Sequence, residues 1–217
     1  MPATQGFIFD MDGVLVDSEP VHIQQEKRSY ARYGVVLDEK ELSRFVGTTQ
    51  RYMWSAIKIQ YELADSVDHL MVQHRRQLME AFNSTALPPM PGVRQFLATL
   101  KKSGIPCAVA SSSPRELVKL ILHKAGLDPF FNEVVCGDEV KHSKPDPEIF
   151  LMAARRLGIP PSHCAVIEDS AHGVAAAKAA GMLCFGLLNP NSGQQNLSEA
   201  DFCVRHHSEI SNWFFGQ

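Results

Sequence analysis

The part of the chain after residue 92 alternates strand-like and helix-like segments, and this alternation limits the possible folds more than any other feature. Short apolar runs end in polar residues, and each is followed by an amphipathic segment that stops at a glycine. The expected strands are residues 105–110, 131–136, 164–167, 183–188 and 202–204, and the expected helices are residues 93–103, 114–124, 145–157 and 170–180, with one more at the C-terminus. Such alternation predicts an α/β fold, a doubly wound parallel sheet with helices on both faces.

A further strand is expected at the start of the chain, where the apolar residues 6–9 are followed by Asp10, Asp12 and Gly13. Because side chains alternate along a strand, the two aspartates start out on the same side. Carboxylates this close repel each other unless they share a cation or a proton. The tetrapeptide alone is also typical of a surface turn, so its meaning depends on what the other strand ends carry.

Residues 18–87 have a different texture, polar-rich with helical spacing and without a convincing strand. The expected helices are residues 21–33, 42–46, 52–61 and 67–82. A proline-rich stretch, residues 87–92, is typical of a domain boundary. We therefore predict a core of residues 1–17 and 88–217, with an all-helical domain of residues 18–87 inserted in it.

Composition excludes several classes of function. The net charge of −3 and the scattered Lys and Arg residues do not indicate nucleic-acid binding. No apolar run approaches the roughly 20 residues that span a bilayer, and no signal-peptide pattern is visible, so we expect no membrane contact and a cytoplasmic location. The five cysteines are widely spaced and lack a C-x-x-C pair, which indicates neither disulfides nor a zinc site.

Polar residues collect at the expected carboxyl ends of the strands, where open parallel sheets bind their ligands. These residues are Asp10, Asp12, Ser111, Lys144, Glu168 and Asp169. Four acids around one lysine form an imbalance that a divalent cation would correct, and Mg²⁺ prefers such oxygen ligands. The same residue types suit phosphoryl transfer: an aspartate can attack phosphorus, a second can move protons, and a hydroxyl, an ammonium and a cation can hold the phosphoryl oxygens.

Each cluster also has an ordinary interpretation. Ser111 could cap a helix, Lys144 could be a solvated loop lysine with Lys141 as a competitor, and Glu168 with Asp169 could favour a helix N-terminus. These interpretations explain the clusters one by one but not their convergence at one edge of the sheet.

The sequence resembles the haloacid dehalogenase superfamily of aspartate-nucleophile phosphotransferases, in the branch that contains β-phosphoglucomutase and small sugar-phosphate phosphatases. Four motifs carry the resemblance, in residues 9–19, 110–113, 143–147 and 167–170, with a helical cap between the first two. The resemblance implies Asp10 as the nucleophile, Asp12 as the general acid and base, and Ser111 and Lys144 on the phosphoryl group. It also implies a Mg²⁺ site formed by Asp10, Glu168, Asp169 and the backbone carbonyl of Asp12.

The resemblance further implies a set of substrate-binding residues: His22, Gly47, Thr48, Gln50, Arg51, Ser112 and Arg115. His22 matches a cap-hinge histidine, although an ordinary surface histidine is equally compatible with the pattern. Gln50 stands where the mutase has the arginine that grips a second phosphate, and Arg51 is displaced by one residue, which turns a helical side chain by roughly 100°. Arg115 follows Ser113 and Pro114 where the mutase has a serine–lysine pair.

These observations predict a Mg²⁺-dependent phosphatase of a small phosphorylated metabolite, expected to be a sugar phosphate, that works through an aspartyl-phosphate. The alternative is a β-phosphoglucomutase, which returns the phosphoryl group to the sugar. A two-component receiver is excluded because its acidic pair precedes the acceptor and it has no cap, and Asp12 weighs against dehalogenases and phosphonate hydrolases. We expect a monomer.

Overall fold

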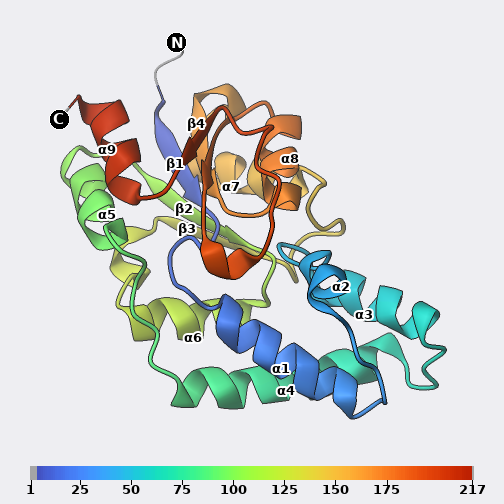
Figure 1. Cartoon of the computed structure of the whole chain (residues 1–217). Helices are drawn as coiled ribbons and strands as arrows, with labels where there is room; N and C mark the ends of the chain where they lie inside the picture. Colours follow the sequence, from blue (N-terminus) through green and yellow to red (C-terminus); the bar gives the residue numbers. More distant parts are fainter. Residues whose placement is uncertain (1–3, 217) are drawn as a thin grey trace.

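The computed structural model describes residues 4–216 and contains one parallel sheet of six strands (Figure 1). The strands are β1 (Gly6–Phe9), β2 (Cys107–Ser111), β3 (Glu133–Cys136), β4 (Cys164–Glu168), β5 (Leu183–Leu187) and β6 (Phe202–Val204). Their order across the sheet is β3-β2-β1-β4-β5-β6, and every neighbouring pair is parallel. The order reverses between β1 and β4, so this sheet edge is where a ligand is expected. The predicted fold class is confirmed.

Helices cover both faces of the sheet. The helices α5 (Val93–Lys102), α6 (Arg115–Ala125) and α9 (His207–Phe215) pack on one face, and α7 (Glu148–Leu157) and α8 (Ala171–Ala179) on the other. Alternate residues of β1 enter the two layers: Phe7 stacks edge-on against Phe96 of α5, with 5.4 Å between ring centroids, whereas Ile8 packs under α7 and α8. Because β1 is buried on both faces, its position at the centre of the sheet follows directly from its unbroken apolar run.

The predicted elements are all present, with shifted boundaries. The helix expected at residues 42–46 is α2 (Glu39–Ser43), three residues earlier, and α7 begins at Glu148 instead of Pro145. The Asp146 carboxylate accepts a hydrogen bond from the Glu148 N–H, at 2.9 Å, so an acidic side chain caps the helix two residues ahead of its first turn. Strand β3 begins at Glu133 instead of Phe131, because residues 128–130 form a 3₁₀ turn before it.

Residues 19–84 form four helices and, within this segment, no strand of the sheet, as the spacing predicts: α1 (Glu19–Ala31), α2 (Glu39–Ser43), α3 (Gln50–Gln60) and α4 (Val67–Ser84). They enclose a small core of their own around Trp54 and Tyr30. The C-terminal end of α4 is different, because Leu78 and Phe82 join the main core and Lys124 of α6 donates to the Phe82 carbonyl at 2.7 Å. The predicted domain boundaries at residues 17 and 88 stay a prediction.

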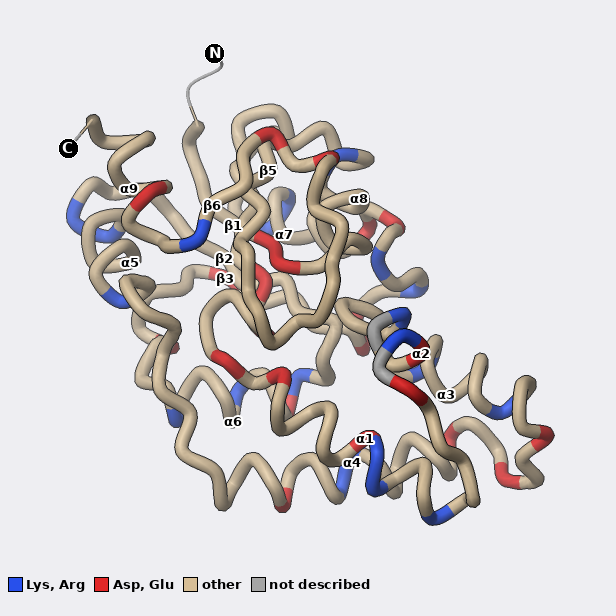
Figure 2. Tube along the Cα trace, viewed as in Figure 1, with Lys and Arg blue, Asp and Glu red and all other residues tan. Residues whose placement is uncertain are grey.

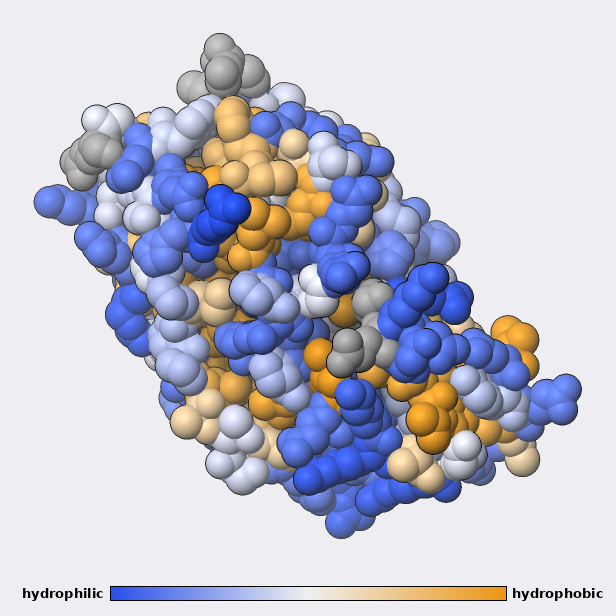
Figure 3. All heavy atoms as spheres, in the orientation of Figure 1, coloured by the Kyte–Doolittle hydropathy of each residue, from blue (hydrophilic) through white to orange (hydrophobic). Residues whose placement is uncertain are grey.

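The surface carries no concentrated positive charge on the side shown in Figure 2, where Lys and Arg alternate with Asp and Glu. Apolar atoms on this side form separate patches among hydrophilic ones (Figure 3). Within residues 4–216, no helix is long and apolar enough to cross a membrane. All five cysteines are free thiols; Cys203 is exposed and the other four are buried.

One buried histidine makes the fold sensitive to acid. His207, at the start of α9, is 1% exposed and its Nε2 has no hydrogen-bond partner within the described residues. Burial lowers the pKa of His207 to about 4, against an opposing hydrogen bond to the Pro91 backbone. An unfolded histidine titrates near 6.5. Between these values the unfolded chain binds a proton that the folded chain does not, so stability falls as the pH drops below 6.5.

We therefore expect His207→Gln to lose less stability than the wild type between pH 7 and pH 5, by about 2 kcal/mol. Urea unfolding at the two pH values measures this difference, which also cancels the contribution of every other titrating group. His123→Gln is the matched control, because the His123 side chain is exposed on α6. Equal pH dependence of the His207 variant and the wild type would contradict the prediction.

Candidate active site

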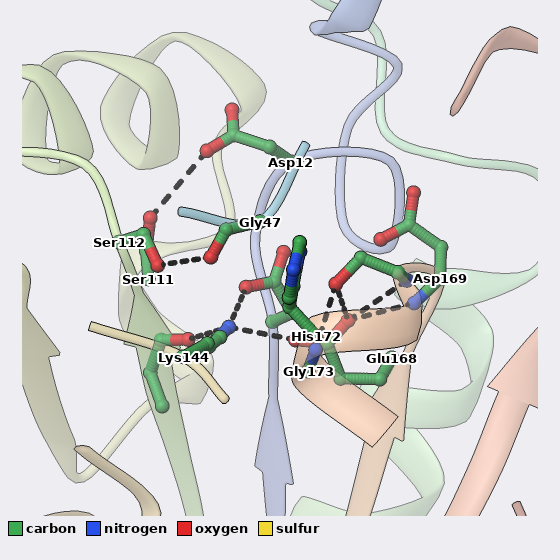
Figure 4. A network of polar contacts seen from close by, with 12 residues as sticks. Asp12, Gly47, Ser111, Ser112, Lys144, Glu168, Asp169, His172 and Gly173 are labelled. Atoms are coloured by element: carbon green, nitrogen blue, oxygen red, sulfur yellow. Dashed lines mark hydrogen bonds and ion pairs between the residues drawn. The ribbon is translucent and has the colours of Figure 1, made fainter. Parts of the chain in front are cut away.

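The carboxyl ends of three central strands bring the predicted catalytic residues together (Figure 4). Asp10 follows β1, Ser111 ends β2, and Glu168 ends β4 with Asp169 directly after it. Lys144 reaches the same point from the loop before α7. All five side chains are buried. The convergence that the sequence predicts at this edge is therefore present.

Lys144 joins two of the acids. Its Nζ donates to Asp10 Oδ1 at 2.5 Å, to Glu168 Oε1 at 2.6 Å and to the Ala110 carbonyl of β2 at 3.2 Å. Burial alone would lower the pKa of Lys144, but the two carboxylates raise it above the ordinary value. Lys144 is therefore a charged group buried inside the site, and the interpretation as a solvated loop lysine is wrong.

The negative charges of Asp10 and Asp169 are not fully balanced by the protein groups around them. Burial raises the pKa of Asp10 to about 8; Lys144 opposes the rise, while Glu168 and Asp12 add to it. The pKa of Asp169 is raised well above its usual value by burial and then by the charges of Glu168 and Asp10. Oδ2 of Asp169 accepts a hydrogen bond from Ser192. Buried carboxylates that repel one another in this way fit a divalent cation with oxygen ligands.

Glu168 is held by protein donors on both oxygens. Oε1 accepts from Lys144, and Oε2 accepts from the backbone N–H groups of Asp169 and Ser170, each at 3.0 Å, and from the Ser170 hydroxyl at 2.9 Å. Gly173 leaves the room for this carboxylate, since a Cβ at that position would lie 1.8 Å from Oε1. Glu168 therefore positions Lys144, and its predicted role as a metal ligand stays a prediction.

Asp12 accepts four hydrogen bonds. Its Oδ1 receives the Ser18 hydroxyl at 2.5 Å and His22 Nε2 at 3.0 Å, and its Oδ2 receives the Ser113 hydroxyl at 3.1 Å and the Ser111 hydroxyl at 3.4 Å. Burial would raise the pKa of Asp12, but the charge and hydrogen bond of His22 outweigh it and lower the pKa. Burial would lower the pKa of His22, but the charge and hydrogen bond of Asp12 raise it to about 9. His22 is thus a partner of Asp12, supplied by α1.

The loop that follows α2 lies against the sheet edge. The Ser112 hydroxyl donates to the Gly47 carbonyl at 2.7 Å (Figure 4), and His172 Nδ1 lies 3.3 Å from the Val46 carbonyl. Gly47 has a φ of +77°, and a Cβ there would lie 2.4 Å from the Ser170 hydroxyl oxygen. Only glycine allows this loop to come so close to the core.

A cavity of about 310 Å³ lies between the core and the helical segment. Asp10 and Asp12 line it on the core side, and the predicted binding residues that line it are His22, Gly47, Thr48, Gln50 and Ser112. Its size is typical of a site for a small molecule. The two predicted catalytic aspartates therefore open onto a space in which a metabolite can be bound.

The two predicted binding arginines point elsewhere. Arg51 forms an exposed ion pair with Asp68 at 2.7 Å and borders a wider hollow that adjoins the cavity, as its one-residue displacement on α3 predicts. The guanidinium of Arg115 pairs with Glu139 and donates to the Val134 carbonyl at 3.1 Å. The structure brings neither arginine into the cavity with Asp10 and Asp12, so the predicted substrate contact of Arg115 has no basis in this arrangement.

Several residues of the site had no signal in the sequence that assigned them a role. Ser18 and Ser113 bind Asp12 and flank motifs that were recognised, so their positions in those motifs were the only hint. The buried carboxyl of Glu19 also lines the cavity, and burial raises its pKa to about 8, opposed by His22. Ser192 reaches Asp169 from 23 positions away, at the end of the 3₁₀ helix Pro190–Ser192, and no local pattern marks it.

A cluster of buried acids and one lysine at the edge of a six-stranded parallel sheet is the arrangement to compare with known proteins. A family model for haloacid dehalogenase-like hydrolases matches residues 4–181, and the chain belongs to this family. A phosphorylated carbohydrates phosphatase of Thermotoga maritima is 34% identical over 210 residues, covering 96% of this chain and 97% of that protein. The fructose-1-phosphate phosphatase YqaB of Escherichia coli is 33% identical over 177 residues, covering 82% and 93%.

Among solved structures, a β-phosphoglucomutase of Clostridium difficile superimposes with a TM-score of 0.86 over 98% of this chain and 95% of that one. The two sequences are 22% identical, so this likeness concerns the fold. Together with the family match, the phosphatase relatives identify the chain as a hydrolase.

The buried Lys144 cluster predicts a large effect on stability. Lys144→Met leaves Asp10 and Glu168 buried without their cation, so we expect a loss of about 3–5 kcal/mol in the free energy of unfolding at pH 7 without added metal. The double variant Lys144→Met/Glu168→Gln removes one of the uncompensated charges and should recover part of the loss.

Urea unfolding measures both variants. The matched control is Lys178→Met, because Lys178 pairs with Asp201 at 2.7 Å but is partly exposed, and such pairs contribute at most about 1 kcal/mol. Similar losses for Lys144→Met and Lys178→Met would show that the buried cluster is not the stabilising element described above.

Proposed function

We propose that this hydrolase is a Mg²⁺-dependent phosphatase that removes phosphate from a small phosphorylated carbohydrate through an aspartyl-phosphate at Asp10. The observation that carries the proposal is that Asp10 and Asp12 line one cavity of metabolite size while Lys144 lies 2.5 Å from Asp10. The two phosphatase relatives, one named for phosphorylated carbohydrates and one for fructose 1-phosphate, support this substrate class.

In the first step, a carboxylate oxygen of Asp10 forms a bond to phosphorus while the bond from phosphorus to the leaving oxygen breaks. Lys144 contacts Asp10, and the Ser111 hydroxyl lies 3.4 Å from Asp12 Oδ2 at the neighbouring strand end, so both can hold the phosphoryl oxygens. The Lys144 charge also favours the ionised form of Asp10, which is the form that attacks.

Asp12 carries out the proton transfers to the leaving oxygen and from the attacking water. Its Oδ1 lies 3.0 Å from Nε2 of His22, so the pair shares one proton, which passes through Asp12 to the leaving oxygen as the bond from phosphorus breaks, and the alcohol departs neutral. After the alcohol departs, Asp12 accepts a proton from the water that attacks the phosphorus of the aspartyl-phosphate. Free phosphate then leaves and Asp10 is restored.

The residues at this site fit Mg²⁺, because burial and then the neighbouring acids raise the pKa values of Asp10 and Asp169. Asp10, Asp169 and the Asp12 backbone carbonyl would hold the ion, with Glu168 beside them. When bound, Mg²⁺ neutralises the carboxylates and the phosphoryl oxygens that lie against them. We propose that the core and the helical cap divide at residues 17/18 and 87/88, and that the chain acts as a monomer.

A β-phosphoglucomutase remains the alternative, supported by the fold and by the β-phosphoglucomutase of Bacillus subtilis, which is 31% identical over 210 residues and covers 94% of this chain. Such an enzyme must hold a second phosphate while the sugar turns over, and a cation is the natural group for that purpose. Arg51 is paired with Asp68 and Arg115 with Glu139, both away from the cavity. The arrangement therefore supports a phosphatase more than a mutase.

Asp10→Asn should abolish phosphate release from sugar phosphates, by at least ~10³-fold in kcat, because the amide cannot form the aspartyl-phosphate. Steady-state phosphate release measures the effect, and an unchanged circular dichroism spectrum shows that the fold is kept. Asp128→Asn is the matched control, since Asp128 is exposed in the 3₁₀ turn before β3. Near-normal turnover by the Asp10 variant would exclude this residue as the nucleophile.

Removing divalent cations with a chelator should stop phosphate release, and added Mg²⁺ should restore it. Ca²⁺ should not restore it, because it is larger and takes more ligands at longer distances. Activity is measured after chelation, after Mg²⁺ addition and after Ca²⁺ addition. Full activity in the chelated enzyme would rule out the metal-dependent mechanism.

A further inference from the structure

The part of the cavity that faces the leaving group is built by the helical cap. Asp12 delivers the proton to the leaving oxygen, so the alcohol portion of the substrate lies on the Asp12 side of the cavity. The cap residues there include the polar Glu26, Gln50 and His74 and the apolar Ile23 and Met53. These side chains, from α1, α3 and α4, determine which alcohol fits.

His74 is fixed as a hydrogen-bond acceptor. Its Nδ1 lies 2.8 Å from the Ser29 hydroxyl oxygen, and that hydroxyl donates its own proton to Gln77 Oε1 at 2.7 Å. The Ser29 oxygen must therefore accept from Nδ1–H, which leaves a lone pair on Nε2. Burial and the nearby charge of His22 lower the pKa of His74 to about 3, so the ring is neutral. Within the described residues, Nε2 has no hydrogen-bond partner.

Two further acceptors lie in the same wall. Oε1 of Gln50 is buried and has no partner among residues 4–216, although a buried polar atom normally has one. The carboxyl group of Glu26 lines the cavity, and burial, opposed by His22, raises its pKa to about 7. Glu26 is thus anionic or neutral near neutral pH and carries no positive charge in either form.

Positive charge is scarce around this space. Among the described residues that line the cavity there is no arginine, and the cations are His22, which is paired with Asp12, and Lys27, which is exposed. Arg51 and Arg75 border the adjoining wider hollow, which shares Thr49, Gln50 and Ser112 with the cavity, but neither arginine lines the cavity itself. A second phosphate in the cavity would therefore meet unpaired acceptors and a carboxyl group without a dedicated cation, an arrangement that costs binding energy.

We propose that the cap side of this cavity binds the uncharged, hydroxyl-bearing end of a sugar or polyol monophosphate through His74, Gln50 and Glu26, and excludes substrates that carry a second phosphate there. Hydroxyl groups of the alcohol donate to these three acceptors, while its carbon skeleton packs on the apolar residues between them. The inference rests on the proposed phosphatase activity and specifies its substrate class.

The first test compares fructose 1-phosphate with fructose 1,6-bisphosphate as substrates of the wild-type protein. Whichever phosphate of the bisphosphate reacts, the other one must enter the cap side of the cavity. We expect kcat/KM for the monophosphate to be at least ~10-fold higher. Equal or faster release from the bisphosphate would overturn the inference while leaving the phosphatase in place. Release from neither compound, nor from any other sugar phosphate, would instead contradict the proposed function.

Substitutions of Gln50 and His74 test the roles proposed for these two residues. Gln50→Arg adds a cation at the buried acceptor and should reduce the preference for the monophosphate about tenfold. Gln50→Met is the matched control, since it removes the acceptor without adding charge and should keep the exclusion of the bisphosphate. His74→Phe should raise KM for the monophosphate about tenfold with a smaller change in kcat, because the lost hydrogen bond is at the non-reacting end.

Lys27→Met removes the exposed lysine that lines the cavity among the described residues and should leave the ratio of the two substrates unchanged. If the ratio changes with Lys27 but not with Gln50 or His74, the assignment of these acceptors is wrong. Ser29→Ala, which releases the His74 ring from its fixed tautomer, should weaken monophosphate binding in the same direction as His74→Phe but by less.

Binding without turnover provides a second readout. Calorimetric titration of Asp10→Asn with each compound should give tighter binding of fructose 1-phosphate than of the bisphosphate. Tighter binding of the bisphosphate would overturn the inference and direct attention to the arginines of the wider hollow.

Discussion

The buried charge of Lys144 is the interaction on which the arrangement of this site depends. Its ammonium group contacts residues at the ends of β1, β2 and β4 at once, through Asp10, Ala110 and Glu168. A buried ammonium group without such partners would be strongly unfavourable, so the loop that carries Lys144 must close over these strands. Glu168 is in turn fixed by Ser170 and by the space that Gly173 leaves. The nucleophile is therefore oriented by the same contacts that hold the sheet edge together.

The second aspartate depends on the cap. Ser18 and His22, which approach Asp12 from the start of α1, are only six and ten positions further along the chain, because the helical segment is inserted directly after the first motif. The cap also contacts the core through the Gly47 carbonyl and Ser112. Any movement of α1 away from the sheet edge would thus remove the charge that lowers the pKa of Asp12, which links the position of the cap to the proton chemistry.

Much of this could be predicted from the sequence, since the features concerned are local. Each strand is a short apolar run, each catalytic residue directly follows such a run or stands in a recognisable motif, and the order of the motifs identifies the family. What could not be predicted depends on packing between distant elements. Arg115 turns to Glu139 and Ser192 reaches Asp169, and neither contact leaves a pattern in the neighbouring residues. The start of α7 depends on the Asp146 carboxylate rather than on the prolines around it.

The two sides of the cavity recognise a substrate by different physical means. On the core side, Asp10, Asp12 and Asp169 line the cavity, and in the proposed function these acids and the divalent cation that they would hold recognise a phosphoryl group by charge. On the cap side, neutral His74 and Gln50 present acceptors, and the nearest arginines are engaged or lie outside the cavity. Charge acts over a longer range than a hydrogen bond and is less specific. Because the charged groups lie at the core end of the cavity, they determine which end of a monophosphate reacts. The hydrogen bonds of the cap then discriminate between alcohols.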